Sequence, residues 1–251
     1  MLAPRVNAVL VVGGKYHDMD FARLELLKLL AEHPRIRTTV LPDYADGDAL
    51  TAADMLVTYT VDRVPDEATA ARLRDWVAGG KRWFALHGTN SILKWSKADK
   101  AWAAPRTSPT FMDTLGSQFL AHPPIAPYTV EVTQPDHPLV AGIEPFEADD
   151  ELYLSALYPP FQTLLHTRWS GQAELFVDRD WSSDEPRPVM YLKKLGDGEV
   201  LYLTLGHARG HYDMQPLMPE YPEVERGSWK TPAFYELLRR GLSWAGRLGD
   251  N

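Results

Sequence analysis

The sequence predicts an α/β protein built on a mostly parallel β-sheet with helices on both faces. Its first hundred residues alternate between short apolar runs and segments of helical periodicity, in the order strand, helix, strand, strand, helix, strand. Parallel strands need crossover connections, which are right-handed in nearly all proteins and place helices against the sheet. A strand-rich second half and a C-terminal amphipathic helix follow. We expect one domain over residues 1–251.

The elements of the first half follow from hydrophobic period. Residues 8–12 are a continuous aliphatic run closed by Gly13 and Gly14, as in a strand buried on both faces. Apolar residues then recur at helical spacing over 21–30. The same reasoning predicts strands over 37–41, 54–60 and 81–86, and a helix over 65–77 that starts at a proline and ends before two glycines.

The second half begins with residues 91–127, which mix tryptophan, proline, serine and threonine without a clear period. This composition indicates a long loop excursion over the sheet. Further strands are expected over 129–132, 162–166 and 173–177, and a hairpin joins 189–195 to 200–205 through Gly196-Asp197-Gly198. The closing helix, over 231–248, is expected to direct Phe234, Leu238, Leu242 and Trp244 into the core.

Composition excludes several classes of function. The net charge of −8, with scattered lysine and arginine, opposes binding to nucleic acid or to anionic membranes. The chain has no cysteine, so disulfides, thiolate metal ligands and a cysteine nucleophile are excluded. The N-terminal segment lacks a secretory signal and no run reaches the length of a membrane span, so we expect a cytoplasmic protein.

Polar clusters stand where predicted strands end or in the loops between them. In open parallel sheets, ligands bind beyond the carboxyl ends of the strands, so these clusters are expected to converge on one site. The clusters are Tyr16-His17-Asp18, His87-Gly88-Thr89-Asn90, His122-Pro123, Asp150-Glu151-Leu152-Tyr153 and Gly206-His207.

Each cluster also has a purely structural interpretation. A lone histidine at a strand end is more often a hydrogen-bonded structural group than a catalyst, and Asp150 can cap a helix. His207 and His211 have helical metal-ligand spacing, with Asp213 as a third ligand, but flanking glycines favour a loop that presents His207 alone. Tryptophans in irregular segments can stack on a sugar or anchor a loop; they are Trp95, Trp102, Trp181 and Trp229.

A series of short motifs runs along nearly the whole chain: His17-Asp18 after a glycine-rich turn, Phe84-Ala85-Leu86-His87-Gly88, Phe119 with His122-Pro123, Asp136-His137-Pro138, Asp150-Glu151-Leu152-Tyr153, Arg187-Pro188-Val189, and Gly198 through Gly206-His207. In this order, the motifs resemble the ThuA-like trehalose-utilisation family, whose fold is similar to that of class I glutamine amidotransferases. The resemblance implies a flavodoxin-like sheet with an added hairpin.

The resemblance implies a role in bacterial sugar catabolism beside a sugar dehydrogenase that makes 3-keto-glycosides. His87 occupies the turn that holds the amidotransferase cysteine, so glutamine hydrolysis through a thioester is excluded. A C3 ketone acidifies the C2 hydrogen, and histidine or carboxylate groups can then perform acid–base chemistry at C2 and C1 with cleavage of the glycosidic bond. The alternatives are a keto-sugar isomerase and a non-catalytic sugar-binding or regulatory module.

The expected catalytic residues are His17, His87, His122, Glu151 and His207. The expected substrate-binding residues are Tyr16, Asn90, Trp95, Asp150, Tyr153, Arg209 and His211. A divalent metal, zinc or manganese, could instead polarise the ketone, with His17, His122, His207 and Glu151 as candidate ligands. The expected partner is a small carbohydrate, and a homo-oligomer is compatible with the sequence.

Overall fold

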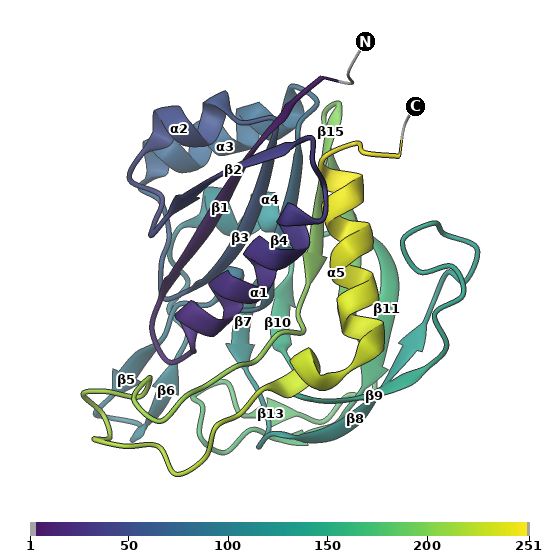
Figure 1. Ribbon diagram of the computed structural model, residues 1–251. Coiled ribbons are helices and arrows are strands. Elements are labelled where there is room, and N and C mark those ends of the chain that lie inside the picture. The colour runs from purple at the N-terminus through teal and green to yellow at the C-terminus, as the bar shows by residue number, and fades with distance from the viewer. Residues whose placement is uncertain (1–3, 250–251) are drawn as a thin grey trace.

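The protein, described by a computed structural model over residues 4–249, is built around one large sheet. The sheet has nine strands in the order β2-β1-β3-β4-β15-β14-β11-β8-β9 (Figure 1). The first five are mutually parallel: β2 (Ile36–Leu41), β1 (Val6–Gly14), β3 (Met55–Val61), β4 (Arg82–Leu86) and β15 (Gly198–Leu203). The other four pair antiparallel: β14 (Pro186–Leu195), β11 (Gln162–Arg168), β8 (Ala126–Val132) and β9 (Phe146–Asp150). The predicted α/β architecture is confirmed.

Helices cover both faces of the parallel strands (Figure 1). One face carries α1 (Met19–Ala31) and α5 (Pro232–Ala245), and the other carries α2 (Gly47–Ala52), α3 (Glu67–Ala78) and α4 (Pro109–Leu115). Because side chains alternate along a strand, Leu10 packs toward α1 and α5 while Val9 and Val11 pack toward α2 and α3. The aliphatic residues of β1 therefore contribute to the hydrophobic cores on both faces of the sheet.

Two predicted segments differ from the structure, and one helix was not predicted. Residues 173–177 do not form the predicted strand but a turn with one bridge between Trp102 and Phe176, and Leu175 and Val177 are exposed. The excursion over 91–127 is more ordered than expected. It holds β5 (Lys94–Ser96), β6 (Ala101–Ala103), α4, and β7 (Ser117–Ala121) paired with β10 (Leu154–Leu157), and the short helix α2 was not predicted.

The β14–β15 hairpin is confirmed, although its turn differs in detail. Leu195 pairs with Gly198, so the loop consists of Gly196 and Asp197. Gly196 has a φ of +58°, a value that favours glycine at the first loop position. The positive φ therefore falls on Gly196, the first residue of the loop.

The carboxyl ends of the parallel strands lie at the lower edge of the sheet in Figure 1, opposite both chain termini. Short elements and loops gather there: the 3₁₀ helix η1 (His87–Asn90) after β4, a long loop after β15, and the 3₁₀ helix η2 (Gly227–Lys230). The small pair β12 (Gly171–Gln172) and β13 (Asp180–Trp181) also lies at this end. Over residues 4–249, no helix has both the length and the apolar character needed to traverse a bilayer.

Candidate functional site

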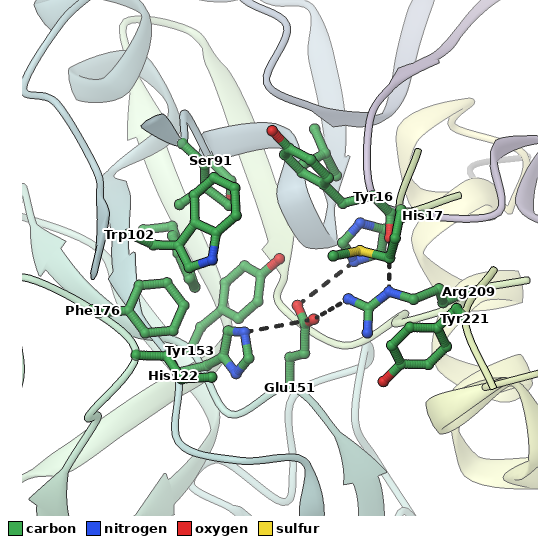
Figure 2. Close-up of a pocket in the computed structure, with 15 residues that line it drawn as sticks. Tyr16, His17, Ser91, Trp102, His122, Glu151, Tyr153, Phe176, Arg209 and Tyr221 are labelled. Carbon is green, nitrogen blue, oxygen red and sulfur yellow. Dashed lines mark hydrogen bonds and ion pairs between the residues drawn. The ribbon is translucent and has the colours of Figure 1, made fainter. Parts of the chain in front are cut away.

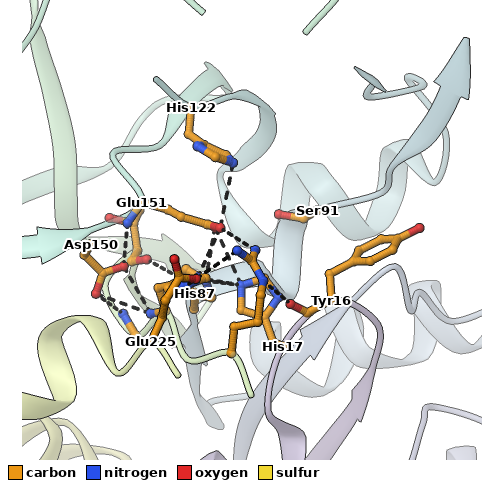
Figure 3. A network of polar contacts seen from close by, with 12 residues as sticks. Tyr16, His17, His87, Ser91, His122, Asp150, Glu151 and Glu225 are labelled. Atoms are coloured by element: carbon orange, nitrogen blue, oxygen red, sulfur yellow. Dashed lines mark hydrogen bonds and ion pairs between the residues drawn. The ribbon is translucent and has the colours of Figure 1, made fainter. Parts of the chain in front are cut away.

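Four side chains from separate segments meet at this edge of the sheet. His17 follows β1, His87 opens η1 directly after β4, Glu151 follows β9, and His207 follows β15. One ligand atom from each lies within 4.8 Å of the others, and all four residues are buried (Figure 3). We call His17, His87, Glu151 and His207 the histidine–glutamate cluster. Its donor set suits either acid–base chemistry or a divalent metal ion.

The position of His87 depends on an unusual backbone. His87 has a φ of +46°, in the left-handed region, which turns the chain sharply from β4 into η1. Its carbonyl accepts a hydrogen bond from the hydroxyl of Tyr202, and its Nδ1 lies 2.8 Å from the carbonyl oxygen of Thr204. Nδ1 therefore donates to this carbonyl, and Nε2 lies 2.8 Å from Nε2 of His17.

His207 lies between two carboxylates. Its Nε2 is 2.7 Å from Oε2 of Glu225, and its Nδ1 is 3.1 Å from Oε1 of Glu151 and 3.2 Å from Nε2 of His17. Burial opposes protonation of His207, but Glu151 and Glu225 outweigh it and raise the pKa to about 9. Burial dominates at His17 and lowers its pKa to about 3. The two imidazoles therefore differ in protonation at neutral pH.

Glu151 is held as a carboxylate. Burial alone would raise its pKa, but the neighbouring His207 and His122 hold the pKa well below its usual range. Arg209 adds a guanidinium with Nη2 at 3.4 Å from Oε1 of Glu151 and Nη1 at 2.9 Å from Oε2 of Glu225. The cluster thus has a positive charge, that of Arg209, and a negative charge, that of Glu225, beside it.

Asp150, the neighbour of Glu151, has a different environment. Its buried carboxylate accepts hydrogen bonds from the backbone N–H groups of Gly206 at 2.9 Å, His207 at 3.1 Å and Ser228 at 3.0 Å. Asp150 therefore ties the end of β9 to the loop after β15 and to η2. It positions Glu151 and His207 and does not line the pocket.

A pocket of about 230 Å³ opens beside the cluster (Figure 2). His17 and Glu151 reach its wall, whereas His87 and His207 lie behind them. Its apolar wall is formed by Val61, Leu93, Trp102, Phe119, Tyr153, Leu175, Phe176 and Met214. Its polar wall is formed by Tyr16, His17, Ser91, His122, Glu151, Arg209 and Tyr221.

His122 lies at the border between the two walls. Its Nδ1 is 2.7 Å from the carbonyl oxygen of Pro123, so Nδ1 carries a proton, and Nε2 faces Oε1 of Glu151 at 3.7 Å. The side chain is 19% exposed, while those of His87 and His207 are 0% exposed. Among the histidines around Glu151, His122 is therefore the most exposed, and it lines the pocket together with His17 (Figure 2).

The structure brings the expected catalytic residues together. His17, His87, His122 and His207 all lie around the carboxylate of Glu151. Of the four metal ligands expected from the sequence, His17, His207 and Glu151 lie together. The fourth member of the group is His87, and the expected ligand His122 does not belong to it. Tyr16, Tyr153 and Arg209 line the pocket as expected for substrate binding.

The remaining expected binding residues do not line the pocket. Asn90 is buried and donates from Nδ2 to the hydroxyl of Ser117 at 2.7 Å. Trp95 is 50% exposed and packs edge-on against Trp102. His211 points away, with Nδ1 2.7 Å from the carbonyl oxygen of Tyr221.

Two neighbours of the cluster, Glu225 and Tyr221, carried no signal in the sequence. Glu225 contacts His207 and Arg209, and Tyr221 lies with its ring 4.9 Å from the Arg209 guanidinium. Both belong to an irregular segment that returns to the site because Arg209 and Glu225 form a two-way backbone bridge. Because this segment has no hydrophobic period, its position beside the cluster could not be predicted from the sequence.

Solved structures with the same fold share little sequence with this chain. A ThuA-like protein from Bacteroides uniformis ATCC 8492 superposes with a TM-score of 0.65 at 16% identity, over 98% of this chain and 93% of the other. One from Parabacteroides merdae ATCC 43184 gives a TM-score of 0.60 at 16% identity, over 96% and 90%. A β-galactosidase from Halorubrum lacusprofundi gives 0.55 at 17% identity, over 98% of this chain but 31% of its own.

Among curated proteins, none matches this chain in sequence. A family model does match. It covers residues 8–219, from within β1 to within the loop after β15, and this range contains every member of the histidine–glutamate cluster. The chain belongs to the ThuA family, described as trehalose utilisation.

Proposed function

We propose that this protein is a sugar-catabolism enzyme that removes the C2 proton of a 3-keto-glycoside and cleaves the bond between C1 and the glycosidic oxygen. One observation carries the proposal: the histidines of the cluster and His122 surround the carboxylate of Glu151, at the wall of a pocket that also has aromatic lining residues. The family description, trehalose utilisation, supports a sugar as substrate. The strand order β2-β1-β3-β4-β15 supports a flavodoxin-like, amidotransferase-related scaffold.

The pocket suits a sugar ring with one reactive edge. Aromatic faces stack on the apolar C–H faces of sugars, and Trp102, Phe119 and Phe176 offer such faces. Hydroxyl and carbonyl oxygens can then face the polar wall, where Arg209 and the imidazoles provide donors. The keto form matters because a C3 ketone acidifies the hydrogen at C2.

His122 is the proposed base. Its Nδ1–H is held by the Pro123 carbonyl, so in the neutral ring the lone pair is on Nε2, which lies 3.7 Å from Oε1 of Glu151 at the pocket wall. In the proposed first step, Nε2 removes the C2 proton and the C–H electrons form an enolate whose charge lies on the C3 oxygen. The cation of Arg209 stabilises that oxygen electrostatically.

In the second step, the C3 carbonyl re-forms, a double bond forms between C1 and C2, and the bond between C1 and the glycosidic oxygen breaks. His122 passes its proton to the departing oxygen. Water then adds at C1 by the reverse sequence, so the net reaction consumes one water and releases the keto-sugar and an alcohol. Glu151 remains ionised because its pKa is held well below the usual range, so it orients His17 and Arg209 and does not serve as the acid.

Incubation with a panel of 3-keto-glycosides, followed by product analysis, tests the proposal. We expect release of the alcohol, and His122→Asn should lower kcat by about 10²–10⁴-fold, the usual contribution of a positioned acid or base. His211→Asn is the matched control, because His211 lies outside the pocket and should leave kcat unchanged.

Other products would overturn the proposal in distinct ways. A rearranged sugar without a released alcohol would identify a keto-sugar isomerase. Sugar binding without conversion of any compound, unaffected by His122→Asn, would identify a binding module.

A further inference from the structure

We propose that His17, His87, His207 and Glu151 bind one divalent transition-metal ion, with Glu225 as the outer carboxylate that orients His207. The inference concerns the donor atoms of the cluster and holds for whichever sugar reaction the pocket supports. It rests on the spacing of those atoms, on the hydrogen bonds behind them, and on their access to the pocket.

The spacing fits a coordination sphere. The Nε2 atom of His17 lies 2.8 Å from Nε2 of His87 and 3.2 Å from Nδ1 of His207. Oε2 of Glu151 lies 3.6 Å from His17 and 3.5 Å from His87, and Oε1 of Glu151 lies 3.1 Å from His207. Ligands about 2.0–2.2 Å from a metal lie about 3.0 Å apart in an octahedron and about 3.4 Å apart in a tetrahedron. These five separations are close to those values, and all four ligand atoms lie within 4.8 Å of one another.

The hydrogen bonds behind the imidazoles point the same way. In metal sites, each ligating histidine donates its other N–H to a carboxylate or carbonyl oxygen. Here Nδ1 of His87 faces the Thr204 carbonyl at 2.8 Å, Nδ1 of His17 faces the Lys15 carbonyl at 3.4 Å, and Nε2 of His207 faces Glu225 at 2.7 Å. These contacts turn three nitrogen atoms toward one point.

Glu225 completes the arrangement from the loop after β15. One of its oxygens, Oε2, accepts from both His207 and Arg209, and the other accepts from the Tyr221 hydroxyl at 3.0 Å. These bonds fix the His207 ring with Nδ1 toward the centre. Glu225 thus acts on the metal through His207, as a positioning residue.

The donor set selects the class of ion. Three imidazole nitrogens and one carboxylate suit zinc, manganese, iron or cobalt, whereas magnesium and calcium prefer oxygen ligands. His17 and Glu151 line the pocket, so a substrate oxygen can approach the ion from that side. An ion there would supply Lewis acidity to a ketone or neighbouring hydroxyl.

Metal content and metal titration test the inference without any sugar. The full-length protein should bind one Zn²⁺, Mn²⁺ or Co²⁺ per chain after chelator treatment and dialysis, and the Co²⁺ absorption spectrum should report coordination by nitrogen and oxygen. His17→Ala and Glu151→Gln should abolish stoichiometric binding, and Glu225→Gln should weaken it by about 10–100-fold.

Two histidines that are not ligands serve as controls. His122→Ala and His211→Ala should retain one ion per chain, because neither side chain belongs to the converging set. Circular dichroism checks that each variant is folded, and Glu151→Gln preserves the shape of the side chain if His17→Ala does not fold.

Failure to bind any of these ions, or equal binding by Glu151→Gln and the unmodified protein, would overturn the site. Metal binding without conversion of any keto-glycoside would support the site and overturn only the proposed reaction.

Discussion

At the scale of single residues, Asp150 and Glu151 show how adjacent carboxylates take separate roles. Asp150 accepts backbone N–H groups from two distant loops, whereas Glu151 contacts side chains of the cluster. Successive side chains of an extended segment point in opposite directions, which separates the two groups. Asp150 therefore connects backbone segments, and Glu151 faces the histidines of the cluster.

Asp150→Asn should therefore lower the free energy of unfolding by about 2–3 kcal/mol, because one carboxylate oxygen that accepts N–H bonds becomes a donor. Urea denaturation provides the measurement. Asp149→Asn is the matched control, since Asp149 is the exposed neighbour on β9 and should change stability little. Equal effects of the two substitutions would show that the buried hydrogen bonds of Asp150 are not stabilising.

At the scale of elements, the contact between α5 and β4 depends on a glycine. Gly241 is buried in the middle of α5, and a Cβ placed on it would lie 2.4 Å from Cε1 of Phe84. A helix normally favours alanine over glycine by about 1 kcal/mol. Here close packing against Phe84 outweighs helix propensity.

Gly241→Ala should accordingly destabilise the protein by about 1–3 kcal/mol, the usual cost of overpacking. Adding Phe84→Leu should recover part of the loss, so the double variant should be more stable than the sum of the single effects predicts. Thermal unfolding measures all three variants. Gly79→Ala, where the nearest atom would lie 3.4 Å away, should be tolerated. Additive effects at Gly241 and Phe84 would contradict the steric explanation.

At the scale of the whole molecule, segments from the two ends of the chain close one face of the sheet. Helices α1 and α5 pack side by side in Figure 1, and the Tyr235 hydroxyl donates to Oε2 of Glu25 at 2.9 Å across 210 positions of sequence. A hydrogen bond from Lys28, with a further one from Tyr235, lowers the pKa of Glu25. This contact makes part of the global stability dependent on pH.

Because the folded pKa of Glu25 lies below its unfolded value of 4.5, its stabilisation is present above pH 4.5 and is lost as pH falls through the folded pKa. Glu25→Gln should thus lower the urea midpoint at pH 7, and the difference should shrink below pH 4.5. Tyr235→Phe, which removes only the hydroxyl, should show the same trend. A difference that persists unchanged at pH 3 would refute the linkage.

The sequence alone determined the strands β1 to β4 with helices α1 and α3, the β14–β15 hairpin, α5 and the clusters at the strand ends, but not the short helix α2. These features depend on local rules: hydrophobic period, glycine and proline at boundaries, and the placement of polar residues after parallel strands. Histidines 17, 87 and 207 were accessible to prediction because each closely follows such a strand.

Only the tertiary structure decided which of these groups share a centre. His87, and not His122, joins His17 and His207, because a left-handed residue after β4 turns its ring inward. Glu225 and Tyr221 reach the site through a loop with no period, and Asp150 turns away to bind backbone N–H groups. Periodicity records which side of an element is buried, but distances between side chains of remote segments depend on packing that no local pattern contains.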